Sequence, residues 1–144
     1  MWPVTLEIVH IAIAAAWFGH KLLIPGDIRR AVHAGGAESE ALMGRMKRAE
    51  RFGILSGLGT LLSGGTLMWL VGIDTVDTGI WVGLGLVVVA LIVGAMTGRP
   101  ASRLLRDAVG RGDRVEATIA GGQISRALGL ESLLWIGALV AMVV

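Results

Sequence analysis

Residues 79–97 consist of the apolar sequence GIWVGLGLVVVALIVGAMT, in which no residue is charged. A helix of this length rises about 28 Å at 1.5 Å per residue, and the hydrocarbon core of a bilayer is about 30 Å thick. A helix of a soluble protein would instead carry polar residues at the helical period. The stretch therefore predicts a transmembrane helix.

Three other stretches are apolar over comparable lengths, namely residues 3–24, 52–73 and 127–144. The chain of 144 residues is 54% hydrophobic and only 17% charged, whereas a soluble domain carries about 25% charged residues. It has no cysteine, which excludes disulfides and thiolate metal sites. The sequence therefore predicts one all-α domain over residues 1–144, an integral membrane four-helix bundle.

Turn and capping residues predict where the helices end. Pro25-Gly26 is a typical stop signal for the first helix. Gly98-Arg99-Pro100 is expected to break or kink the third, because proline removes a backbone donor and clashes with the preceding turn. Residues 39–48 predict a helix that continues into the second span, with Ser39 as its N-cap. Residues 113–116 have the aspartate version of a capping box, so the fourth helix should begin well before the membrane.

The basic residues are confined to two segments of the chain, one at or between the first two helices and one between the last two. Together these segments hold all 13 of them: Lys21, Arg29, Arg30, Arg45, Lys47, Arg48 and Arg51, then Arg99, Arg103, Arg106, Arg111, Arg114 and Arg126. The loop at residues 74–78 has none. The positive-inside rule therefore predicts that both basic segments are cytoplasmic and both termini are outside (N-out/C-out), with helical cytoplasmic extensions.

This topology explains the other features of the charge distribution. Trp2, Trp69 and Trp81 all fall at the outer interface, where aromatic residues are enriched. The net charge is only +2, so we expect the basic residues to contact lipid head groups and no nucleic acid. The predicted location is a bacterial-type inner (plasma) membrane.

Glycines recur at a spacing of four in the second and third helices. Gly53 and Gly57 form one such pair, and Gly79 and Gly83 form another. Small residues at this spacing let helix backbones approach closely in a membrane. A tight bundle and a slot for a flat cofactor both remain open as explanations. In the loops, the glycines of Gly35-Gly36 and of residues 110–112 predict turns.

Few ionisable residues lie within the apolar spans, and each is a candidate functional group because charge is costly in lipid. They are Glu7, His10, His20 with Lys21 beside it, and Glu131. We expect His20 and Glu131 to pair near the inner leaflet, either as a structural pair or as a proton relay. Glu7 and His10 have the spacing of a di-iron motif, but such sites need a second copy of it, so a di-metal site is not expected.

His10 is the candidate cofactor ligand. It lies about 12 Å below the outer interface, and a neutral imidazole is a good axial ligand for haem iron. Met68, at about 8 Å depth on the second helix, is a candidate second ligand, and a homodimer would supply another histidine. The alternative is a structural His10 that bonds Glu7 or a neighbouring carbonyl.

Several short motifs resemble one superfamily of membrane proteins, the HemJ-type protoporphyrinogen oxidases and the copper-resistance D (CopD) proteins, with an uncharacterised four-helix branch. The motifs are His10-Ile11, Trp17-Phe18-Gly19, residues 22–25, residues 46–51, Trp81 and residues 99–105. The resemblance implies that His10 binds haem. The HemJ pattern also has a histidine and a lysine after the tryptophan that opens the third helix. Here Gly83 and Gly85 occupy those positions, which argues against protoporphyrinogen oxidase activity and favours the uncharacterised branch.

Two functions of different classes follow from the sequence. The first is a haem-b-binding inner-membrane protein, active in electron transfer or a linked oxidation, with a redox partner in the membrane. The second is a non-catalytic membrane subunit or a transporter-like protein whose histidines are structural. The sequence does not settle whether the chain is an enzyme.

Overall fold

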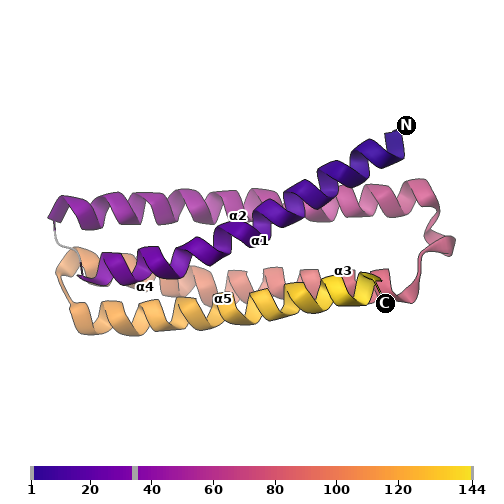
Figure 1. The fold of residues 1–144 in the computed structure, drawn as a ribbon. Helices are drawn as coiled ribbons and strands as arrows, with labels where there is room; N and C mark the ends of the chain where they lie inside the picture. The colour runs from indigo at the N-terminus through magenta and orange to yellow at the C-terminus, as the bar shows by residue number, and fades with distance from the viewer. Residues whose placement is uncertain (1, 34–35, 144) are drawn as a thin grey trace.

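The computed structural model describes residues 2–33 and 36–143, and these form an all-α bundle (Figure 1). Its elements are α1 (Trp2–His33), α2 (Gly36–Val71), the 3₁₀ turn η1 (Ile73–Thr75), α3 (Thr78–Val93), the π-helical segment η2 (Gly94–Gly98), α4 (Arg99–Arg111) and α5 (Arg114–Val143). Because α3, η2 and α4 follow one another directly, they make one long rod. The bundle therefore has four rods, as the sequence predicts.

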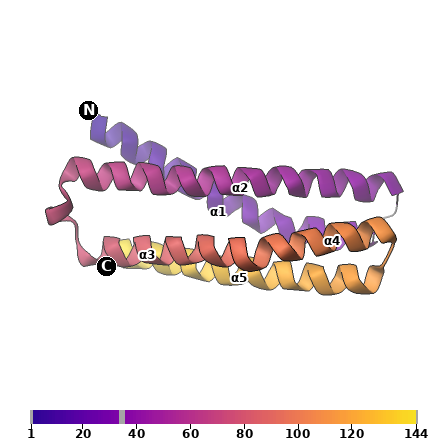
Figure 2. The same ribbon diagram turned by 180° about the vertical axis from the view of Figure 1, so that it is seen from behind.

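The four rods form two antiparallel hairpins. One hairpin is α1 with α2, and the other is the α3–η2–α4 rod with α5. The hairpins are joined mainly by contacts of α1 with α5, whereas α2 and α3 pack little against each other. Both termini and η1 lie at one end, called here the terminal end (Figure 2). The α1–α2 and α4–α5 connections lie at the opposite end, called the basic end.

The surface of the bundle is apolar along most of its length. Four helices are long and apolar enough to cross a membrane, over Val4–His33, Glu38–Val71, Thr78–Arg111 and Arg114–Val143. Large hydrophobic side chains on all four point outward, among them Leu23 and Leu62, each 73% exposed. Monomeric soluble proteins rarely expose apolar surface on this scale. The chain is therefore a multi-pass membrane protein in contact with the lipid bilayer.

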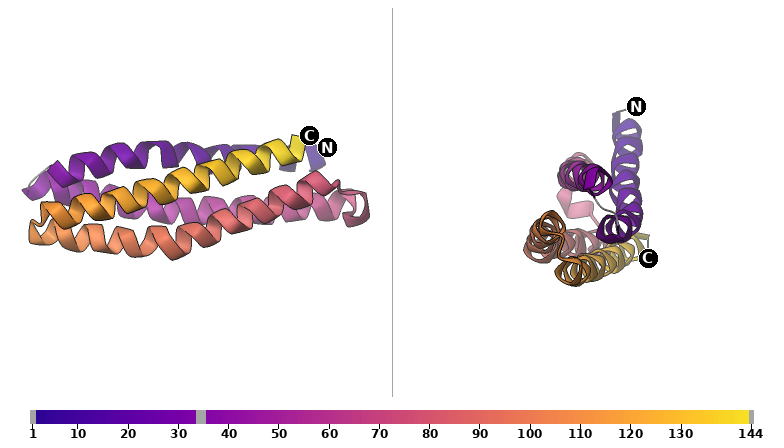
Figure 3. Two further views of the ribbon diagram at one scale, coloured as in Figure 1. Left: turned by 90° about the horizontal axis from the view of Figure 1, so that it is seen from below. Right: turned by 90° about the vertical axis from the view of Figure 1, so that its left-hand side faces the viewer.

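The first helix does not stop at Pro25-Gly26 as the sequence predicts, because α1 continues through both residues to His33. The proline removes only one backbone donor. Beyond it, the buried side chain of Ile28 joins a hydrophobic core at the basic end that includes Leu105 of α4 and Ile124 of α5. This packing outweighs the local cost of the proline. α1 crosses the bundle obliquely, and its N-terminal half leans away from α5 (Figure 3).

The predicted break near Pro100 takes the form of a widened turn. The N–H of Arg99 bonds the carbonyl of Gly94, five residues back, as in a π-helix. Pro100 then lies in the first turn of α4, where a backbone donor is not required. The rod continues without ending, and π-helical turns of this kind are frequent at functional sites.

At the basic end, one cap matches the prediction and one does not. The N–H of Glu116 donates to Asp113 Oδ1 at 3.0 Å, so Asp113 caps α5 as predicted. Ser39, in contrast, lies inside α2, and its Oγ donates to the carbonyl of Ala31 at 3.5 Å, so it joins α2 to α1 and is not an N-cap. The turn predicted at Gly35-Gly36 falls partly outside the described residues, and Gly36 begins α2.

Candidate functional site

Large side chains of α1 pack into notches on the surface of α2. Each notch is the space left by a glycine, which has no side chain. A Cβ atom added to any of four α2 glycines would come within 2.8–3.3 Å of the α1 side chain that faces it. The pairs are His10 on Gly64, Ile13 on Gly59, Trp17 on Gly57 and His20 on Gly53. Protein side chains therefore occupy these notches, which supports the packing role of the α2 glycines over the role of a cofactor slot.

His10 is held against α2 by a hydrogen bond to Ser63. Its Nδ1 lies 2.9 Å from Ser63 Oγ, and Ser63 Oγ itself donates to the carbonyl of Gly59 at 2.7 Å. Because a hydroxyl has only one proton to donate, the tautomer that keeps the bond of Ser63 to Gly59 has the proton on Nδ1 and the lone pair on Nε2. The partner is not Glu7, which is an exposed residue.

Met68 lies on α2, one helical turn beyond the glycine on which His10 packs. It follows Gly64 by four residues, which places it on the same face of α2 and about 6 Å further toward the terminal end. Its side chain is half-buried. Met68 thus lies on the face of α2 on which His10 packs, and its role as a second ligand stays a prediction.

Glu131 is buried in the bundle and forms an ion pair with Lys21. The sequence predicts His20 as the partner of Glu131. Lys21 is 6% exposed and Glu131 7%. Adjacent residues of a helix point in different directions, so His20 faces Gly53 of α2 while Lys21 faces α5. In the described part of the chain the ion-pair partner of Glu131 is therefore Lys21 and not His20. His20 and Glu131 line the same cavity, and a proton relay between them stays a prediction.

Two further contacts hold this ion pair in place. Lys21 Nζ lies 4.5 Å from the ring centroid of Trp17, a cation–π contact. Gly94 leaves room for the carboxylate, because a Cβ there would lie 2.6 Å from Glu131 Oε1. One turn along α1 and α5, the rings of Phe18 and Trp135 stack with their centroids 4.5 Å apart. The ion pair and the ring stack together dock the two hairpins.

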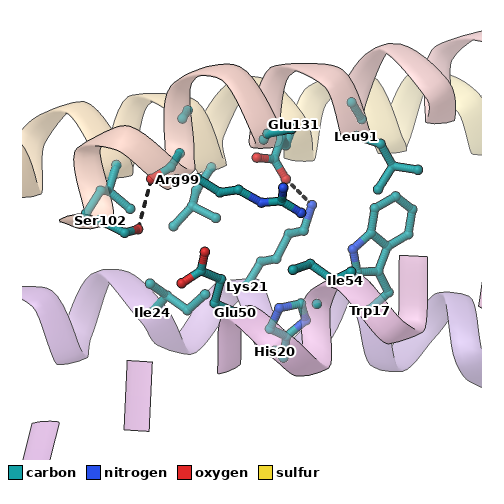
Figure 4. Close-up of a pocket in the computed structure, with 18 of the residues that line it drawn as sticks. Trp17, His20, Lys21, Ile24, Glu50, Ile54, Leu91, Arg99, Ser102 and Glu131 are labelled. Carbon is teal, nitrogen blue, oxygen red and sulfur yellow. Dashed lines mark hydrogen bonds and ion pairs between the residues drawn. The ribbon is translucent and has the colours of Figure 1, made fainter. Parts of the chain in front are cut away.

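The ion pair forms part of the wall of a cavity of about 450 Å³ between the hairpins (Figure 4). Small-molecule sites range from about 300 to 1,000 Å³. Toward the basic end the cavity is lined by charged side chains, including Glu50, Arg99 and Arg106. Arg106 Nη1 lies 3.5 Å from Glu50 Oε2, so these two form an ion pair across the cavity.

The other part of the cavity is apolar and reaches the surface that faces lipid. Leu58 of α2 and Val88 and Ile92 of α3 line it, and they are 49%, 40% and 50% exposed. These exposed side chains belong to two helices that pack little against each other. The cavity therefore opens sideways, between α2 and α3.

The sequence contains a signal for this cavity in addition to its signal for topology. Arg99, Ser102 and Arg106 are spaced at i, i+3 and i+7, which places them on one face of a helix. All three line the cavity. The positive-inside rule accounts for basic residues near a membrane surface, but it does not distinguish those that face a cavity from those that face water.

Comparison of the chain with protein-family models, curated proteins and solved structures finds no match. The resemblance to the HemJ-type and CopD proteins thus rests on the short motifs given above. The structure by itself shows a multi-pass membrane protein of four long apolar helices.

Proposed function

We propose that the chain binds a lipid-borne amphipathic small molecule in the cavity between its hairpins. This function belongs to the second class expected from the sequence, the transporter-like or accessory membrane proteins. The observation that carries it is the cavity itself, with a buried ion pair in its wall and an opening toward lipid.

The position of the ion pair supports a binding role. Ionisable side chains within membrane spans are costly, and they usually face a bundle interior or a cavity on a substrate pathway. Lys21 and Glu131 line the same cavity as the apolar side chains Leu58 and Leu91. A ligand with both a polar and an apolar part matches this lining.

The cavity can be narrowed at Gly98 without a clash. Gly98 lines the cavity, and a Cβ added there meets no atom within 4 Å. Leucine at this position should displace at least two methylene groups of a bound chain, which weakens binding by more than about tenfold. The measurement is quenching of tryptophan fluorescence by dibromostearate in neutral detergent. Trp2, Trp69, Trp81 and Trp135 are replaced by phenylalanine in all variants, so that the signal comes from Trp17, which lines the cavity.

The matched control is Gly85→Leu. Gly85 is an exposed residue of α3 with no atom within 4 Å of an added Cβ, and it does not line the cavity. Both variants gain the same helix propensity. We expect Gly85→Leu to be quenched like the wild type, and equal quenching of Gly98→Leu would contradict binding in this cavity.

We also propose that the termini lie outside and the basic end lies in the cytoplasm, as the positive-inside rule predicts. The chain has no cysteine, so single cysteines report their own location. In intact cells a membrane-impermeant maleimide should label Asp74→Cys, in the exposed η1 turn, and leave Glu40→Cys, exposed at the basic end, unlabelled until the cells are opened. The reverse pattern would invert the topology.

A second candidate function is binding of haem b with His10 as axial ligand. The observation that favours it is the hydrogen bond between His10 Nδ1 and Ser63 Oγ, because the tautomer that donates to Ser63 has its lone pair on Nε2. Metal-ligating histidines commonly donate their other ring N–H to a neighbouring acceptor in this way. His10 would hold the iron of such a group, which would supply electron transfer.

A further inference from the structure

We propose that the ligand of the cavity carries an anionic head group, a carboxylate or a phosphate, and that Arg99 binds it. This inference rests on the proposed function, since it names the class of molecule that the same cavity accepts. It follows from three features of the cavity, namely its charge balance, the direction of the Arg99 side chain and the order of polar and apolar groups along its length.

The charged residues of the lining leave one cation without a partner. Lysine and arginine contribute three residues to the lining of the cavity, and glutamate contributes two. Glu131 is paired with Lys21, and Glu50 is paired with Arg106. Among the described residues, no carboxylate lies within 4.0 Å of the Arg99 guanidinium. An anionic ligand would balance this charge.

Arg99 is placed to bind such a group. It begins α4 directly after η2, and its side chain points into the cavity toward the Lys21–Glu131 pair (Figure 4). A guanidinium presents a planar fork of donors that matches a carboxylate or a phosphate. Like Arg103, Arg99 is an exposed residue, so its guanidinium is accessible to a head group at the edge of the cavity.

The polar and apolar groups are ordered along the membrane normal. On α2 the lining changes from Glu50 to Leu58, and on the antiparallel rod it changes from Arg99 to Leu91. Each pair is eight residues apart, or about 12 Å along the helix axis. Both walls therefore place charge toward the basic end and apolar side chains toward the bilayer centre.

A molecule that follows this order has its head toward the basic end and its chain toward the membrane interior. A lipid in the leaflet at the basic end has the same orientation. It can enter between α2 and α3 without turning over, because the exposed side chains of Leu58 and Ile92 border that opening. We therefore assign the ligand to single-chain amphipathic anions of the membrane.

The test is competition with dibromostearate for the purified full chain in neutral detergent. The competitors are oleate, oleoyl lysophosphatidate, oleyl alcohol, acetate and inorganic phosphate. The variant is Arg99→Gln, and the matched control is Arg103→Gln, an exposed arginine one turn along α4 that does not line the cavity. Because Arg99 is exposed and solvent screens its charge, the anionic chains should bind about five-fold more weakly to Arg99→Gln. The control should bind like the wild type.

Each outcome distinguishes the head-group proposal from the proposed function. Stronger competition by oleate or lysophosphatidate than by oleyl alcohol supports the anionic head, and the better of the two anions identifies it as carboxylate or phosphate. Equal competition by oleyl alcohol overturns the head-group proposal but leaves binding in the cavity intact. If acetate or inorganic phosphate competes as strongly as oleate, the proposal that the ligand is amphipathic is overturned. If the wild type shows no saturable quenching by dibromostearate, both proposals are overturned.

Discussion

Replacing Glu131 by alanine while Lys21 is kept is expected to lower the free energy of unfolding in detergent by about 3–5 kcal/mol. The substitution leaves the Lys21 ammonium buried without a counter-charge, because both side chains of the pair are less than a tenth exposed. Only the contact with the Trp17 ring remains to stabilise it. The measurement is unfolding of the purified protein by a denaturing detergent, followed by circular dichroism.

Two further variants separate the ion pair from general damage at these positions. The double variant Lys21→Met with Glu131→Met removes both charges and should regain most of the loss, since buried pairs are often replaceable by apolar residues of similar volume. Arg111→Ala breaks an ion pair with Glu116 whose side chains are 57% and 42% exposed, and should cost at most about 1 kcal/mol. A double variant as unstable as Glu131→Ala would show that the charges themselves are not the cause.

The same variants bear on why the chain retains the ion pair. The stacked rings of Phe18 and Trp135 already dock α1 on α5 one turn away. If apolar residues at 21 and 131 restore stability, docking alone does not require charge in the membrane. A role in the cavity then accounts for the pair better, and the double variant should bind dibromostearate differently from the wild type even where its stability is normal.

The number and type of helices could be predicted because the apolar runs match the bilayer in length. The cap at Asp113 could also be predicted, because it depends on two residues three apart. The helix ends near Pro25 and Pro100 could not. Whether the helix ends at these prolines depends on packing against other helices. In both places the helix continues because side chains beyond the proline, such as Ile28 and Leu105, are buried in the core.

The partners of the buried residues could be predicted only in part. The sequence indicated that α2 glycines permit close approach, but not that His10 and His20 are the side chains that fill two of the notches. It also indicated that Glu131 needs a partner. The choice between His20 and Lys21 depends on how α1 is rotated about its own axis, a property of the whole bundle that a pattern within one helix does not contain.

A haem ligated by His10 should give a Soret band in the purified protein, with bands that sharpen on reduction. His10→Ala should abolish or shift this band, because the Nε2 lone pair is lost. Ser63→Ala keeps the ligand but removes the acceptor that orients it, and loss of such an orienting partner costs about 10- to 100-fold in affinity. His33→Ala is the control, since His33 is exposed and its Nδ1 contacts the carbonyl of Arg29 at 2.7 Å.

The alternative, a structural His10, predicts a different result for the same variant. The His10 ring fills the notch above Gly64, so alanine would leave a void and an unused acceptor at Ser63. His10→Ala should then lower the thermal midpoint in detergent, as expected for a truncated packing residue, while neither protein shows a Soret band after reconstitution with haem. A Soret band that survives His10→Ala unchanged would keep the haem but place its ligand elsewhere. Spectrum and stability together therefore assign His10 to the cofactor or to the α1–α2 contact.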